Sequence, residues 1–77
     1  MKIKILAFGV IADITGKSEW TIENIHHTDE LKKHLENLYP RLKNMKYAIA
    51  VNLLITSGNF EFTDGVIVAL MPPFSGG

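Results

Sequence analysis

The sequence predicts an α+β fold in which a mixed sheet of about four to five strands packs on one main helix. Two observations support this prediction. Apolar residues recur at helical spacing over one stretch only, residues 28–39, whereas the segments before and after it alternate apolar and polar residues as strands do. The expected order is strand, strand, helix, strand, short strand, strand.

The length and charge of the chain limit its size class and its partners. Its 77 residues suffice for one modest core, so we expect a single domain over residues 1–77, with residues 72–77 as an extended C-terminal tail. Eight basic side chains balance eight acidic ones, which argues against nucleic acid and membranes as partners. The sequence has no Cys, which excludes thiolate chemistry and fits a cytoplasmic location.

The first strand is expected over residues 2–11, which are rich in β-branched and aromatic residues. Both of its faces become apolar toward its end, as in a strand that is covered on both sides. A turn is expected at residues 13–17. Trp20 and Ile22 then alternate with polar residues, which predicts a second strand that forms a hairpin with the first.

The helix is predicted by four leucines at helical spacing, Leu31, Leu35, Leu38 and Leu42. We expect Thr28 to act as its N-cap. Pro40 disfavours helical geometry at the residue before it, so the main helix should end near residue 38 or 39, with a further turn through residue 44.

Residues 47–55 alternate apolar and other residues without a break, which predicts one strand with a deeply buried face. A turn is expected at residues 56–59, followed by a short strand around Phe60 and Phe62. Asp64-Gly65 predicts another turn. The last strand then covers residues 66–71.

The last six residues, PPFSGG, have the chemistry of a tail that enters a partner. Gly76 and Gly77 carry no Cβ, so a narrow slot can admit the backbone there. Pro72 and Pro73 hold φ near −65° and lack N–H donors, so they end the strand and direct the chain outward over about 20 Å. The alternative interpretation of the tail is a frayed chain end.

Several other features have two interpretations. Phe74 could fold back over the domain or anchor a partner. Four more apolar residues could either join the core or form a hydrophobic collar around the tail: Leu6, Phe8, Leu70 and Met71. The three histidines are expected to lie on the surface, and no metal site is expected, because neither a Cys nor an HxxxH pair accompanies them.

Together these motifs resemble the sulfur-carrier proteins of the ubiquitin-like β-grasp superfamily, in particular the small subunits of molybdopterin synthase. The resemblance covers essentially the whole chain. It is carried by KIKILAF at the start, ITG at Ile14–Gly16, AVN at Ala50–Asn52, DG at Asp64–Gly65 and, most specifically, MPPFSGG at Met71–Gly77. The chain departs from the usual pattern at Ile11–Asp13 and after Asp64–Gly65, where Val66 replaces the usual acid.

The resemblance implies a function for the tail. An E1-like enzyme would use ATP to adenylate Gly77, and a sulfur donor would convert the adenylate to a thiocarboxylate. The tail would then enter the large subunit of the synthase, in a heterotetramer, and give its sulfur to a pterin precursor. Gly76, Ser75, Phe74, Pro73 and Pro72 would position Gly77. The resemblance implies no cofactor bound by the chain itself.

No nucleophile, base or metal-ligand set of an independent enzyme is apparent in the sequence. Three alternatives stay open. The chain could be a thiamine-pathway sulfur carrier, which shares the activation step but has another acceptor. It could be a ubiquitin-like modifier of lysines. From a different class, it could be a non-covalent β-grasp adaptor that needs neither terminal glycine.

Overall fold

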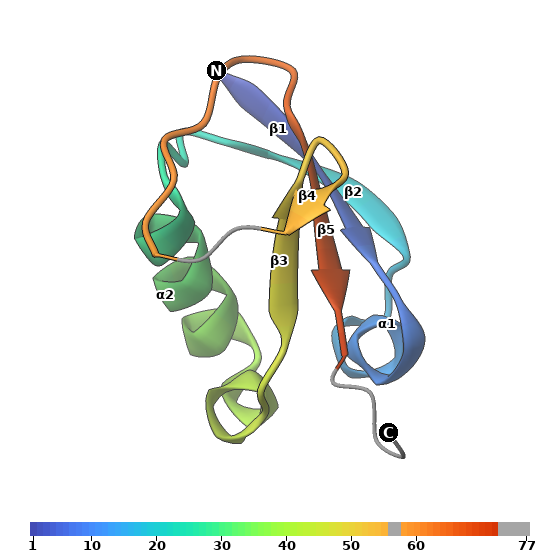
Figure 1. Cartoon of the computed structure of the whole chain (residues 1–77). Coiled ribbons are helices and arrows are strands. Elements are labelled where there is room, and N and C mark those ends of the chain that lie inside the picture. Colours follow the sequence, from blue (N-terminus) through green and yellow to red (C-terminus); the bar gives the residue numbers. More distant parts are fainter. Residues whose placement is uncertain (56–57, 73–77) are drawn as a thin grey trace.

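The computed structural model describes residues 1–55 and 58–72, and a single mixed sheet dominates it (Figure 1). The five strands are β1 (Lys2–Ala7), β2 (Glu19–Glu23), β3 (Ala48–Val51), β4 (Leu54–Ile55) and β5 (Ile67–Met71), in the spatial order β2-β1-β5-β3-β4. The helical elements are α1 (Gly9–Thr15), α2 (Thr28–Leu38) and the 3-10 helix η1 (Pro40–Asn44). The predicted α+β class is confirmed.

The first and last strands lie side by side in the middle of the sheet and run parallel. β5 pairs with β1 from Lys4↔Ile67 to Ala7↔Leu70, and the other neighbouring strands pair antiparallel. The predicted pairing of the first two strands is confirmed, with Ile5 opposite Trp20. They do not form a simple hairpin, because α1 lies between them along the chain.

The prediction of one strand over residues 2–11 followed by a turn is wrong, because β1 ends at Ala7 and α1 begins at Gly9. The helix buries Ile11 and Thr15, four residues apart, on its inner side. Its C-cap is Gly16, with φ +73° and an N–H that donates to the Ala12 carbonyl at 2.8 Å. The β-branched residues of this segment concealed a helix of seven residues.

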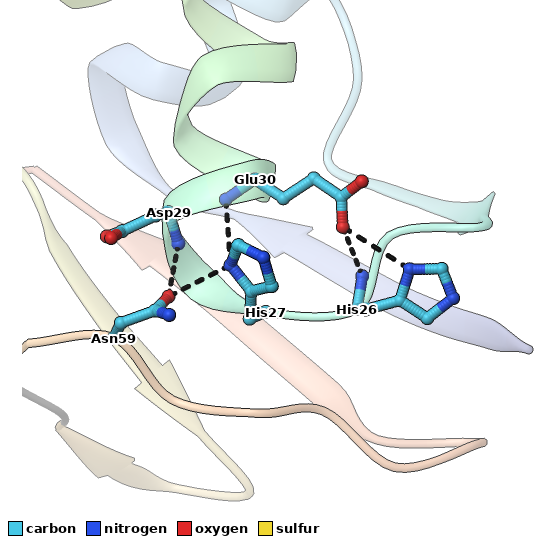
Figure 2. Close-up of polar contacts among 5 residues, drawn as sticks. All are labelled: His26, His27, Asp29, Glu30 and Asn59. Carbon is cyan, nitrogen blue, oxygen red and sulfur yellow. Dashed lines mark hydrogen bonds and ion pairs between the residues drawn. The ribbon is translucent and has the colours of Figure 1, made fainter.

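α2 ends at Leu38 and one turn of η1 follows, as Pro40 predicted. The predicted N-cap is wrong, because His27 caps the helix and its Nδ1 accepts from the Glu30 N–H at 3.3 Å (Figure 2). Asn59 adds a second acceptor, since its Oδ1 receives the Asp29 N–H at 2.8 Å. Thr28 is buried instead, and its hydroxyl accepts from the Phe60 N–H.

The second half of the sheet contains a hairpin where one long strand was predicted. Asn52 and Leu53 both have positive φ, 49° and 74°, which fits a two-residue primed turn, and β4 folds back so that Ile55 faces Ala50. Apolar residues continue to alternate with other residues across the turn, so the sequence pattern did not reveal the hairpin. The expected short strand at Phe60–Phe62 is instead an isolated bridge between Glu61 and His27. The predicted turn at Asp64–Gly65 is confirmed.

The core lies between the inner face of the sheet and the two helices. Buried side chains from all three central strands, from α1, from α2 and from η1 belong to one cluster: Ile3, Ile5, Ala7, Ile11, Leu31, Leu35, Leu42, Ile49, Val51, Val68 and Leu70. Because α1 and α2 both contribute to this cluster, both cover the same face of the sheet. The opposite, outer face carries the alternate residues of each strand.

Two leucines of α2 provide a test of this packing. Leu35→Ala should lower the free energy of unfolding by about 2–5 kcal/mol, because Leu35 is fully buried and its loss leaves a cavity. Leu38→Ala is the matched control, since Leu38 is 58% exposed, and should change stability by less than about 0.5 kcal/mol. Chemical denaturation measures both, and equal losses would contradict this placement of the core.

The cap region predicts a pH dependence. The Glu30 carboxylate accepts the His26 N–H at 2.7 Å and lies 3.4 Å from His26 Nδ1, and these contacts lower its pKa (Figure 2). A lowered pKa stabilises the fold above the pKa of the unfolded chain, and this contribution disappears as the pH falls through the folded pKa. The stability difference between wild type and Glu30→Gln should therefore shrink on acidification. NMR titration of Glu30 tests the cause, and a pKa at or above the ordinary value would refute it.

Candidate functional site

The candidate site is the end of the sheet from which the predicted tail starts. β5 is the central strand, so it is paired on both sides: β1 pairs with it as far as Leu70, and β3 pairs with it through Met71. Met71 still pairs with Ala48, and Pro72 directly follows the strand. The remaining tail residues of the prediction, Pro73, Phe74, Ser75, Gly76 and Gly77, lie outside the described residues.

The start of α1 lies beside this strand end (Figure 1). The Phe8 N–H donates to the Leu70 carbonyl at 3.1 Å, which extends the parallel pairing by one bond beyond β1. Gly9 then opens α1 with φ +56° and lies against the ring of Pro72. Pro72, the first residue of the predicted tail, thus contacts the start of α1, which lies in the segment predicted to be a strand.

One half of the outer sheet face is apolar and reaches this strand end. Cross-strand pairing aligns Leu6 with Ala69, Ala69 with Ala50, and Ala50 with Ile55 in one row across the sheet. Met71 and Ala48 form a second row nearer the tail, and Ile67 lies farther from it. Ala50 is itself buried, and we call the residues around it the outer apolar patch: Leu6, Ala48, Ile55, Ile67, Ala69 and Met71.

The other half of the outer face is charged. Lys2, Lys4, Glu19 and Glu23 occupy the outer positions of β1 and β2, and Lys4 Nζ lies 3.0 Å from Glu19 Oε2. This ion pair is exposed, so it adds little stability. Its two charged side chains border the outer apolar patch, as a polar rim borders the apolar centre of a protein interface.

The four predicted collar residues divide between core and surface. Leu70 is fully buried inside the domain, so its side chain is unavailable to a partner. Phe8 is 49% exposed beside the strand end, whereas Leu6 and Met71 are half-buried on the outer face. Sequence reasoning missed the patch residues Ala48, Ile55, Ile67 and Ala69. Their alternation along the strands was the available signal, but it does not say which face lacks a covering helix.

The polar side chains form structural contacts. His26 and His27 serve the start of α2, and no group of three potential metal ligands occurs within residues 1–55 and 58–72. The Tyr47 hydroxyl donates to Glu36 Oε2 at 3.1 Å, and partial burial together with that carboxylate raises the Tyr47 pKa well above its usual value.

Among the helices of the described residues, none is long and apolar enough to cross a membrane.

Comparison with known proteins gives a consistent result. The model of the ThiS family matches residues 5–77. The molybdopterin synthase sulfur carrier subunit of Caenorhabditis elegans is 32% identical over 83 aligned positions, which cover 100% of this chain and 99% of that protein.

Two solved structures share the fold. One belongs to a complex of subunits 1 and 2 of the molybdopterin-converting factor from Helicobacter pylori, with TM-score 0.73, 27% identity and full coverage of both chains. The other is the small archaeal modifier protein 1 of Methanosarcina acetivorans, with TM-score 0.80 and 18% identity, covering 99% of this chain and 96% of that one. The expected ubiquitin-like β-grasp fold is confirmed. The match over residues 5–77 and the full-length relative place this chain in the ThiS family.

Proposed function

We propose that this protein is the sulfur-carrier subunit of a molybdopterin synthase. One observation carries the proposal: PPFSGG, at residues 72–77, directly follows the central strand and lies within the region that the family model matches. The full-length relative described as a molybdopterin synthase sulfur carrier subunit supports this branch of the family.

The proposed chemistry takes place at the Gly77 carboxylate. This group is an anion at neutral pH and therefore a poor acyl electrophile. One of its oxygens attacks the α-phosphorus of ATP on an E1-like enzyme, and pyrophosphate leaves. A sulfide-level sulfur nucleophile from the donor then forms a C–S bond as the C–O bond to AMP breaks. The product is a thiocarboxylate, which replaces one carboxylate oxygen by sulfur, and the chain itself needs no bound cofactor.

We propose that the large synthase subunit covers the outer apolar patch and Phe8 while it receives the tail. Phe8, Ile55 and Ile67 are exposed and the other patch residues are half-buried, and contiguous apolar surface of this kind is typical of protein interfaces. The patch adjoins the strand end from which the tail starts. The Helicobacter pylori chain was solved in a complex of subunits 1 and 2, which supports a partner of this class. This assembly and the activating enzyme would place the protein in the cytoplasm.

The alternatives differ from this proposal at the acceptor. A thiamine-pathway carrier would restore thiamine auxotrophs rather than molybdenum-cofactor mutants. A lysine modifier would produce conjugates of higher mass, and the likeness to an archaeal modifier supports only a shared fold. A non-covalent adaptor would keep its activity without Gly76 and Gly77. These three outcomes separate the alternatives experimentally.

Loading of the tail can be read directly. Incubation with the activating enzyme, ATP and a sulfur donor should replace one oxygen by sulfur at Gly77, detected by intact and fragment mass spectrometry. Gly76→Val should block this reaction, because a Cβ obstructs a narrow slot, yet change the free energy of unfolding by less than about 0.5 kcal/mol. The reaction without ATP is the control. An unmodified Gly77 under complete conditions would reject the proposal.

The proposed docking surface can be tested with matched substitutions. Phe8→Ser should raise the Kd for the large subunit by about tenfold or more, the effect of removing an aromatic anchor from an interface. Leu38→Ser removes a similarly exposed apolar side chain from α2, on the covered side of the sheet, and should leave the Kd unchanged. Isothermal titration calorimetry measures both constants. Equal effects of the two substitutions would exclude Phe8 as an anchor.

A further inference from the structure

Gly9 and Pro72 meet where the tail leaves the domain. β1 and β5 are held together up to the hydrogen bond from the Phe8 N–H to the Leu70 carbonyl, and the two segments then separate. Gly9 turns into α1, while β5 continues through Met71 to Pro72. The two segments therefore still touch at one point beyond their last shared hydrogen bond.

This contact has no space for a side chain on Gly9. A Cβ built there would lie 2.9 Å from Pro72 Cγ, 3.7 Å from Cδ and 3.9 Å from Cβ. Real Cβ atoms essentially never approach another heavy atom within 3.0 Å, and nine in ten such contacts are longer than 3.4 Å, so the ring would have to move by up to about 0.5 Å to accept even a methyl group. The bare α-carbon of Gly9 is thus a close-fitting support for the Pro72 ring.

We propose that Gly9 is a positioning residue that sets the direction in which the tail leaves the sheet. The inference rests on the proposed function, since the direction of the tail matters because the tail has to bring Gly77 to a partner. Pro72 has a fixed φ and is followed by Pro73, which restricts its ψ, so a displaced ring should redirect the residues beyond it. Reacting groups that are misplaced by about 1 Å can lose about 10²-fold in rate.

A competing explanation is that Gly9 serves only to allow its positive φ at the start of α1. Gly16 provides the matched control at the other end of the same helix. Its φ is +73°, and among the described residues no heavy atom outside its own chain neighbours and helix backbone lies within 4 Å of a Cβ built there. Gly9→Ala and Gly16→Ala therefore share backbone strain, and only Gly9→Ala presses on Pro72.

The experiment compares the two variants in sulfur transfer to the pterin precursor with the thiocarboxylated protein and the large subunit. Gly9→Ala should lower kcat by about 10²-fold and leave the Kd for the large subunit within about threefold, because the docking surface is intact. Gly16→Ala should retain kcat within about twofold, although it shares the strain. Equal kcat values for the two variants would overturn the inference.

A double-mutant cycle attributes the effect to the ring. Pro72→Gly removes the ring, so adding Gly9→Ala to Pro72→Gly should lower kcat no further than about twofold. A full additional loss in that background would overturn the inference, because Gly9 would then act without Pro72.

An NMR measurement that does not depend on catalysis tests the inference independently of the proposed function. The wild-type protein should give NOEs between the Gly9 α-protons and the Pro72 ring protons, and Gly9→Ala should shift the Pro72 ring carbons while Gly16→Ala leaves them in place. Absence of these NOEs would overturn the inference even if Gly9→Ala fails to fold. Failure of wild-type loading at Gly77 would instead reject the proposed function.

Discussion

The parallel pairing of β1 with β5 is the constraint on which the rest of this structure depends. It places the last strand in the centre of the sheet, where β1 holds it as far as Leu70 and β3 holds it to its final residue, Met71. It also brings Phe8 and Gly9, from the start of the chain, beside Leu70 and Pro72. A tail that follows an edge strand would lack this support, and its origin would be less well fixed.

The two faces of the sheet have different surroundings. The inner face is filled by α1 and α2, which accounts for the stability of a small body. The outer face is free of helices in the described part of the chain and is itself divided into an apolar half and a charged half. A modest apolar patch with a charged border suits a surface that binds a partner protein and releases it.

Sequence patterns predicted the elements whose periodicity is unambiguous and failed where two structures share one pattern. The leucines of α2 and the alternation in β2 located both elements correctly. The hairpin after β3 was missed because alternation continues through Asn52 and Leu53, and Leu53 is an unusual residue for positive φ. α1 was missed because its residues favour strands, although Gly16 was a visible helix-stop signal.

The family of the chain was predictable from its sequence, whereas the geometry of the candidate site was predictable only in part. PPFSGG indicated the family without any coordinates, since the motif is local in sequence. The outer apolar patch depends on pairing between strands far apart in the chain, and the support under Pro72 depends on an unpredicted helix. Leu70 illustrates the limit: its neighbours in sequence face outward, yet its own side chain is fully buried.

Because β1 and β5 run in the same direction, Met1 and Pro72 lie at opposite poles of the domain (Figure 1), separated by about 17–20 Å of strand. A fluorophore, an affinity handle or a solid support attached through the amino terminus would consequently sit on the far side from the exit of the tail. The fold thus offers an immobilisation geometry that leaves the end of β5 facing the solution.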